Sequence, residues 1–156
     1  MINYFDRPYR PCVGIVLANH QRKILVGQRL DNSVEAWQMP QGGIDDGETP
    51  FEAGMREMLE EVGTNKASYV AEHPEWLDYD IPEGLANSLW DGRFRGQTQK
   101  WLLFRFDGDD SDINIATDIP EFRAWKWAEP EVLPDLAVPF KRDVYKGVLS
   151  AFIDQL

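Results

Sequence analysis

The chain has 156 residues, of which 43% are hydrophobic, and this length suits one domain with a substantial core. Its net charge of −11 argues against non-specific binding along a nucleic-acid backbone, because such binding needs Lys and Arg to neutralise phosphates. Cys12 is the single cysteine, so no internal disulfide can form, and no apolar run reaches the length of a membrane span. We therefore expect one cytoplasmic domain over 1–156 with no membrane partner and no extended nucleic-acid surface.

Hydrophobic patterning predicts short strands interspersed with a few helices. After a loose arm over 1–10, the expected strands cover residues 12–18, 24–29, 37–40, 67–72, 76–81, 100–106 and 121–127. A polar loop is expected over 30–36, a longer loop over 82–96, and one or two helical turns over 129–133. The chain should end in an amphipathic helix over 140–155, whose core-facing residues are Val144, Tyr145, Val148, Leu149 and Phe152.

The best-defined helix lies between Thr49 and Gly63. Thr49 stands at the N-cap, Pro50 at the first helical position, and Glu52 where a capping box needs its acid. Gly63 stands where helices commonly end. On a helical wheel the apolar residues share one side, which is predicted to face a core: Phe51, Met55, Met58, Leu59 and Val62.

The opposite side of this helix gathers Glu57, Glu60 and Glu61. Glu57 and Glu61 form a like-charge pair four residues apart, and the helix dipole disfavours anions in the last turn. Local rules broken at one place indicate function, and clustered carboxylates are ligands for hard cations such as magnesium, which often share them with substrate phosphates. The alternative is a solvated acidic face, but Gly42 and Gly43, directly before the helix, favour a binding site.

The stretch from Gly42 to Thr64 resembles the Nudix box, G-x5-E-x7-R-E-U-x-E-E-x-G-U, in which U is aliphatic. The matching residues are Gly42, Glu48, Arg56, Glu57, Met58, Glu60, Glu61 and Gly63, while Thr64 departs from the final aliphatic position. The resemblance implies an α/β fold, an αβα sandwich with a mixed sheet. It also implies hydrolysis of a nucleoside diphosphate linked to another group, with magnesium or manganese as the cofactor.

The same resemblance implies roles for the box residues. Glu57, Glu60, Glu61 and the backbone carbonyl of Gly42 would hold the metal. Glu57 and Glu61 are both candidates for the general base, and that choice stays open. Arg56 would orient the glutamates rather than touch the substrate, and Glu48 would support it.

Beyond the box, the chain is similar to the bacterial RNA pyrophosphohydrolases and the related asymmetric dinucleoside tetraphosphate hydrolases. The similar segments are 9–11, 37–43, 96–101, 120–122 and 140–145. This resemblance implies that Glu121 joins the metal site, that Phe140 stacks on a base, and that Arg10 and Lys141 contact the nucleotide or its phosphates. Phe140 could instead simply cover the start of the last helix.

Two further cations have two interpretations. Arg29 and Lys100 stand near the ends of predicted strands, where each could be solvated or could neutralise a phosphate. Four tryptophans, Trp37, Trp101, Trp125 and Trp127, are expected to be core and sheet residues rather than base platforms.

These features predict an enzyme that removes pyrophosphate from triphosphorylated RNA 5′ ends. The alternatives are asymmetric cleavage of diadenosine tetraphosphate to ATP and AMP, a nucleoside-triphosphate or nucleotide-sugar pyrophosphatase, and a nucleotide-sensing domain without catalysis. The intact acidic set argues against a sensor. The loop over 30–36 is longer than in short-loop RNA pyrophosphohydrolases and also occurs in dinucleoside tetraphosphate hydrolases, so the sequence leaves both activities open.

Overall fold

A computed structural model describes residues 2–31 and 35–156, and a mixed sheet of seven strands organises them. The strands are β1 (Tyr9–Ala18), β2 (Ile24–Arg29), β3 (Gln41–Gly43), β4 (Ala67–Glu72), β5 (Leu77–Asp80), β6 (Gly96–Phe106) and β7 (Phe122–Ala128). The α-helices are α1 (Pro50–Val62), α2 (Glu83–Ser88), α3 (Leu133–Leu136) and α4 (Arg142–Phe152). Short 3-10 helices cover Tyr4–Asp6, Trp90–Gly92, Asp110–Asp112, Pro130–Val132, Pro139–Lys141 and Ile153–Gln155.

The sheet is built around β1 and β6, which pair in parallel from Tyr9 opposite Gly96 to Ala18 opposite Arg105. The strand order is β4-β6-β1-β2-β7, with β3 paired to β1 and β5 paired to β6. Every residue of β1 from Cys12 onward is buried. A strand covered on both faces has to be apolar throughout, which explains its continuous hydrophobic run.

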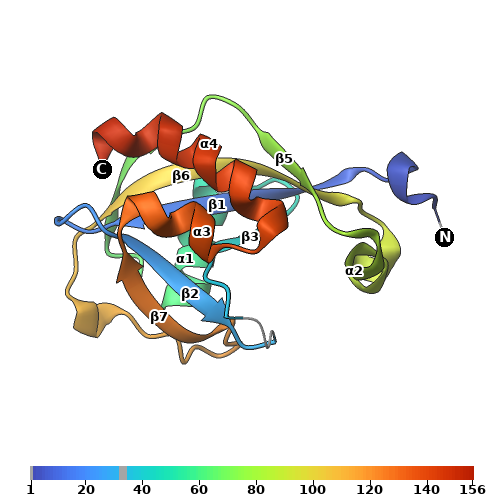
Figure 1. Ribbon diagram of the computed structural model, residues 1–156. Coiled ribbons are helices and arrows are strands. Elements are labelled where there is room, and N and C mark those ends of the chain that lie inside the picture. The colour runs from blue at the N-terminus through green and yellow to red at the C-terminus, as the bar shows by residue number, and fades with distance from the viewer. Residues whose placement is uncertain (1, 32–34) are drawn as a thin grey trace.

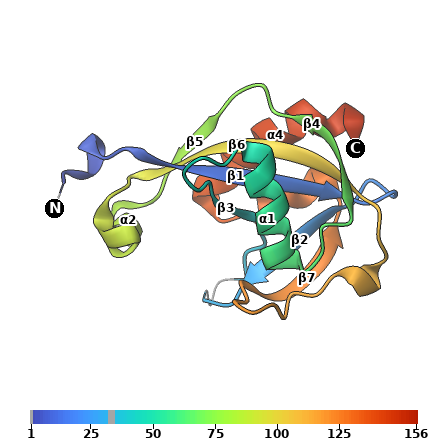
Figure 2. The ribbon, with the colours of Figure 1, turned by 180° about the vertical axis from the view of Figure 1, so that it is seen from behind.

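Helices cover both faces of this sheet. Figure 1 shows α3 and α4 over one face, and Figure 2, from behind, shows α1 across the other. The core under α4 contains Trp101 and Tyr145, while the core under α1 contains Leu102 and Met58. The predicted sandwich with a mixed sheet is confirmed. No helix among the described residues is long and apolar enough to cross a membrane.

The predicted core face of α1 is partly wrong. Met58 and Val62 are buried as expected, but Phe51 is 45% and Leu59 50% exposed. The buried stripe instead runs through Ala53 and Gly54, where a Cβ on Gly54 would lie 3.1 Å from the Leu102 side chain. Small residues let this part of the helix approach the sheet closely, while Phe51 lies at the margin of the core, where its ring meets those of Tyr69 and Phe104.

Several loops carry more structure than the patterning predicts. Residues 37–40 form no strand, only a bridge between Gln38 and Gly27, and β3 begins just after them. The expected loop over 82–96 contains α2 and a 3-10 helix. The arm over the described residues 2–10 is not loose, because Tyr4 is buried and its hydroxyl donates to the carbonyl of Ile81 at 2.6 Å.

The C-terminal predictions fare better. A 3-10 turn and α3 follow β7, and the expected core residues of α4 are buried, with Leu149 partly so. β6 begins at Gly96, four residues before the predicted strand, and β7 begins one residue after Glu121. The loop over 30–36 lies partly outside the described residues.

Candidate active site

The start of α1 is fixed by its own sequence. The Thr49 hydroxyl accepts from the Glu52 backbone at 3.1 Å, and the Glu52 carboxylate accepts from the Thr49 backbone at 3.0 Å. Gly63 ends the helix with φ of 78°, a conformation that favours glycine. The predicted capping box and helix end are confirmed, and they fix the positions of the glutamates of the last two turns along the helix axis.

The glycine loop lies directly against these glutamates. Gly42 in β3 pairs with Val13 of β1, and a Cβ on Gly42 would lie 2.0 Å from the carboxyl carbon of Glu57. The absence of a side chain at Gly42 therefore makes the space that the Glu57 carboxyl group fills. This contact places a carboxylate beside the backbone of the residue that is predicted to offer its carbonyl to a metal.

Arg56 joins the loop to the acidic side chains. Its guanidinium donates to Glu48 at 2.8 Å, to the Gly43 carbonyl at 2.9 Å and to Glu57 at 2.9 Å, and it lies 3.3 Å from Glu60. The same guanidinium, with the Asp45 backbone N–H, lowers the pKa of Glu48 to about 2. These contacts agree with the orienting role predicted for Arg56 and the supporting role predicted for Glu48.

The glutamates of α1 differ sharply in their surroundings. Glu61 is only 4% exposed, and its carboxylate accepts from the Gln41 backbone N–H at 3.1 Å. Burial, with Glu57 and Glu121 nearby, raises its pKa well above the ordinary value. Burial also raises the pKa of Glu57 to about 7, although Arg56 opposes the shift. Glu60 is the most exposed of the three.

Glu121 reaches this group from the far end of the sequence. β7 pairs with β2, Phe122 lies opposite Arg29, and the Leu30 backbone donates to the Glu121 carbonyl at 2.9 Å. The resulting depression has acidic walls with two aliphatic residues, and its lining is Glu57, Leu59, Glu60, Glu61, Thr117, Asp118, Ile119 and Glu121. The structure thus brings together all four carboxylates predicted for the metal site.

The donors in this depression fit a hard divalent cation in kind, because all of them are oxygens. Thr117 adds a buried hydroxyl oxygen with no hydrogen-bond partner among the described residues. In the part of the chain that the structure describes, no three acidic, His or Cys side chains already converge tightly enough to hold an ion. Arg56 accounts for part of this, since one of its nitrogens bridges Glu57 and Glu60.

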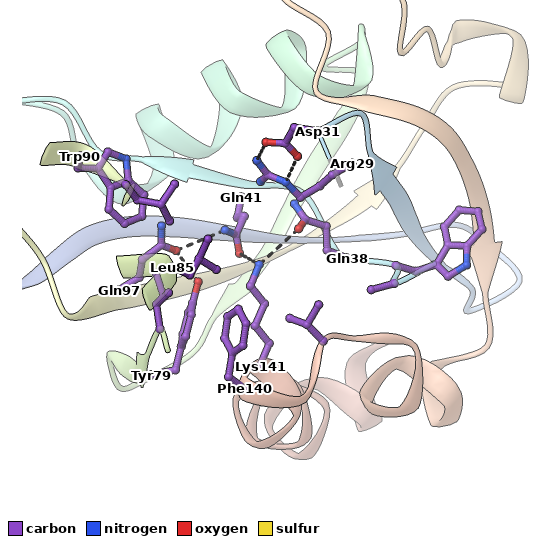
Figure 3. Close-up of a pocket in the computed structure, with 15 residues that line it drawn as sticks. Arg29, Asp31, Gln38, Gln41, Tyr79, Leu85, Trp90, Gln97, Phe140 and Lys141 are labelled. Carbon is purple, nitrogen blue, oxygen red and sulfur yellow. Dashed lines mark hydrogen bonds and ion pairs between the residues drawn. The ribbon is translucent and has the colours of Figure 1, made fainter. Parts of the chain in front are cut away.

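A second cavity of about 470 Å³ lies on the other face of the sheet, at the end near α2 (Figure 3). Its lining is largely apolar or aromatic with a few polar groups, which is typical of ligand sites. The lining residues are Arg29, Asp31, Ala36, Trp37, Gln38, Gln41, Tyr79, Ile81, Leu85, Leu89, Trp90, Gln97, Val138, Phe140 and Lys141. Three of the predicted substrate-binding residues are among them: Arg29, Phe140 and Lys141.

The floor of this cavity is a network of neutral amides. The Tyr79 hydroxyl donates to Gln97 at 2.7 Å, and Gln99 donates to Gln41 at 2.9 Å. Lys141 is buried, and its ammonium donates at 3.4 Å to the side-chain oxygens of Gln38 and Gln41 (Figure 3). No buried carboxylate pairs with Lys141 among the described residues, and burial together with Arg29 lowers its pKa to about 8.

Phe140 and Arg29 have local partners in the cavity. Phe140 is half-buried and stacks on Tyr79, with ring centroids 5.9 Å apart. Arg29 pairs with Asp31, with contacts of 2.6 and 2.8 Å. Its charge is therefore partly neutralised, and a role for Arg29 in neutralising a phosphate stays a prediction.

Lys100 and Arg10 lie on different faces of the sheet. Lys100 is buried in β6 and shares a row with Val13 and Gly42, so it lies on the α1 side rather than at a solvated strand end. Arg10 lies on the cavity side, where a Cβ on Gly43 would approach its guanidinium to 2.2 Å. The expected tryptophan pattern holds for Trp101, which is buried, and for Trp125 and Trp127, which lie in β7 against the core, whereas Trp37 lines the cavity.

Sequence reasoning missed the amide network and Trp90. Glutamines at alternate positions of one strand, Gln97 and Gln99, were the available signal, because polar side chains facing a buried layer need partners. Gln41 matters most, since its backbone N–H donates to Glu61 while its side chain accepts from Lys141. One residue therefore links the acidic depression to the cavity.

The fold and the site together define a class of protein: an αβα sandwich with a glycine loop and an arginine-ordered acidic helix. A family model described as the NUDIX domain matches residues 8–148, and the chain belongs to this family. This chain is a Nudix hydrolase. Members of the family typically depend on a divalent metal.

Curated relatives are similar over nearly the full length. An RNA pyrophosphohydrolase of Roseobacter denitrificans is 58% identical over 147 residues, covering 93% of this chain and 92% of the relative. An RNA pyrophosphohydrolase of Rickettsia typhi is 51% identical over 149 residues, covering 96% and 92%.

Solved structures share the fold at lower identity. The dihydroneopterin triphosphate pyrophosphohydrolase of E. coli aligns with a TM-score of 0.70 at 20% identity, covering 95% of this chain and 99% of that structure. A binary complex of a C. elegans Ap4A hydrolase aligns with a TM-score of 0.65 at 22% identity, covering 93% and 99%. At these identities the likeness supports the fold alone.

Proposed function

We propose that the protein is an RNA pyrophosphohydrolase, which cleaves the bond between the α and β phosphates of a triphosphorylated RNA 5′ end. Water adds to one phosphorus, and the products are pyrophosphate and an RNA with a 5′ monophosphate. The observation that carries the proposal is 58% and 51% identity, over nearly full length, to proteins named for this activity. An RNA substrate also fits the cytoplasmic location predicted from the single cysteine.

The site geometry supports a substrate whose phosphates bind at the acidic depression and whose nucleotide end binds in the cavity. A divalent ion, magnesium or manganese, would be held by the Gly42 carbonyl with Glu57, Glu60, Glu61 and Glu121, and when bound it would neutralise phosphates and acidify a water. Glu57 or Glu61 would accept the proton of that water. Arg56 keeps the glutamates ordered, as its contacts indicate.

The cavity would take the nucleotide end of the substrate. Phe140 offers a half-buried ring for stacking on a base, which contributes about 1–3 kcal/mol in single-stranded recognition. Lys141, Arg10 and Lys100 supply positive charge toward the phosphates, with Arg29 at the boundary between cavity and acidic depression. This arrangement needs only one nucleotide end, which agrees with the net charge of −11.

A product analysis tests the proposal directly. The protein is incubated with magnesium and either a 5′-triphosphorylated RNA oligonucleotide or diadenosine tetraphosphate, at equal concentration. We expect pyrophosphate and 5′-monophosphorylated RNA, with a higher kcat/KM than for the dinucleotide. Faster release of ATP and AMP, without pyrophosphate from RNA, would favour the tetraphosphate hydrolase. Binding of either substrate without turnover would favour a sensor.

A further inference from the structure

The segment Trp90–Gly92, which borders the cavity, has an unusual backbone. Trp90, Asp91 and Gly92 have φ values of 47°, 58° and 68°, all in the left-handed region. A positive φ is uncommon outside glycine, and a bulky residue with one is an outlier. Such strain persists where the surroundings determine it, and it gathers at binding and catalytic sites.

Several contacts hold this backbone in place. The Gly92 backbone donates to the Leu89 carbonyl at 2.8 Å, and the Arg93 guanidinium donates to the Trp90 carbonyl at 3.1 Å. The Trp90 ring meets Phe94 edge-on, with centroids 5.9 Å apart. The result is that the indole lines the cavity instead of pointing into solvent (Figure 3).

The Trp90 ring carries a cation on its face. The Arg10 guanidinium carbon lies 4.8 Å from the ring centroid, within the range of a cation–π interaction. On its other side the guanidinium lies against Gly43, where a Cβ would come within 2.2 Å of a terminal nitrogen. Arg10 is thus held between the indole and the glycine loop, beside the last residue of β3.

Arg10, which reaches the cavity only through its contact with Trp90, differs from Arg56 and Arg29 in having no acidic partner. Arg56 pairs with three glutamates and with Asp45, and Arg29 pairs with Asp31. Within residues 2–31 and 35–156, no carboxylate forms an ion pair with Arg10. Its side chain donates a hydrogen bond only to the Cys12 sulfur among these residues, at 3.4 Å. An ordered guanidinium without an anion is suited to accept one from a substrate.

We propose that Trp90 is a positioning residue, whose strained backbone places the indole under Arg10 so that the guanidinium meets the substrate's phosphates at the glycine loop. The inference rests on the proposed function and adds a residue to it. An unsupported arginine side chain would lose rotamer freedom on binding phosphate, and the indole removes part of that cost beforehand. Trp90 therefore acts on substrate binding rather than on the chemical step.

The test compares variants by steady-state kinetics on a 5′-triphosphorylated RNA oligonucleotide with magnesium, at several salt concentrations. Trp90→Leu keeps an apolar side chain but removes the aromatic face. We expect KM to rise about three- to tenfold with kcat nearly unchanged. The dependence of log KM on log salt should weaken by about 0.7, the value for one lost phosphate contact on a single strand.

Further variants separate positioning from packing. Trp90→Phe keeps a ring for Arg10 and should restore most of the affinity and the salt dependence. Arg10→Met should reproduce the effects of Trp90→Leu, and adding Trp90→Leu to it should change little more, because the two residues act as one unit. Trp76→Leu is the matched control: Trp76 is 45% exposed and does not line the cavity, so KM should not change.

The outcomes are distinguishable. A raised KM with an unchanged salt dependence would mean that Trp90 does not act through Arg10, and would overturn the inference. Additive effects of Trp90→Leu and Arg10→Met, or no rescue by Trp90→Phe, would overturn it as well. A parent protein that releases no pyrophosphate from RNA would overturn the proposed function, and this inference with it.

Discussion

The two sites lie on opposite faces of one sheet and treat buried charge in opposite ways. On the α1 face, Glu57 and Glu61 crowd together, and burial raises the pKa of each. On the cavity face, Lys141 is a buried cation whose pKa burial and the nearby Arg29 lower to about 8, and its hydrogen-bond acceptors are neutral amides. In each site the burial of charge is unfavourable, and a bound ligand of the opposite charge would stabilise it.

This difference indicates that the two sites would have different roles, one in bond cleavage and the other in recognition. The acidic depression suits a metal ion with phosphates, which is where bond cleavage would occur. The amide-floored cavity suits an uncharged base with the edge of a phosphate, which is where recognition would occur. Gln41 contacts Glu61 through its backbone and Lys141 through its side chain, so this one residue connects the two sites.

The largest expected effect comes from metal removal, which should disable the acidic depression and leave the cavity intact. Exhaustive chelation should abolish turnover of triphosphorylated RNA, because the carboxylates cannot neutralise phosphates without an ion. Added magnesium should restore the rate. Binding of the RNA, followed by fluorescence, should persist with weaker affinity after chelation, since the cavity keeps its own contacts. Turnover that survives chelation would contradict the metal site.

Gly42→Ala should have the next largest effect. The added Cβ would lie 2.0 Å from the Glu57 carboxyl carbon, so this carboxylate must move. We expect kcat to fall about 10- to 100-fold, as when groups that orient metal ligands are disturbed, with KM little changed. Gly84→Ala is the matched control, because a Cβ on Gly84 meets nothing within 4 Å. Equal losses in the two variants would mean that Gly42 has no special role.

The acidic site was more readable from the sequence than the cavity was. The capping box at Thr49 and the stop at Gly63 are local signals, and local physics decides them. The half-exposure of Phe51 and Leu59 was not readable, because it depends on how α1 packs on the sheet around Gly54. Glu121 entered only through resemblance, since nothing in its own neighbourhood marks it.

The cavity depends on the pairing of strands that are distant in the sequence, and the sequence alone predicts such pairing poorly. Gln41 and Gln97 come from different strands, and their side chains meet only through the register of β1 with β3 and β6. The backbone of Trp90 is not predictable from its residue type, because tryptophan disfavours a positive φ. Residues whose role comes from tertiary placement therefore had to wait for the structure.

A smaller effect concerns pH and sharpens the cavity side of the comparison. Lys141 is charged below its pKa of about 8 and neutral above it, so attraction to phosphate should weaken as pH rises through that value. The ratio kcat/KM reports groups of the free enzyme, and we expect it to fall several-fold between about pH 7 and 9. Lys141→Met should remove this fall.

Lys146→Met serves as the control for that pH profile. Lys146 is exposed on α4, the helix whose N-cap is Lys141, and it does not line the cavity. Its loss should leave the alkaline limb in place. An alkaline limb that also survives in Lys141→Met would assign the titration to another group and would contradict the role of the buried lysine.

The most direct test of the division between the two faces is one set of steady-state curves on triphosphorylated RNA with magnesium, for Glu57→Gln and Phe140→Ala beside the parent. Glu57→Gln should lower kcat by about 10²–10⁴-fold, the range for losing a catalytic acid or base, with a similar KM. Phe140→Ala should raise KM by the equivalent of about 1–3 kcal/mol of stacking, with kcat largely kept. If both variants lower the same parameter to the same degree, the two faces do not divide chemistry from recognition.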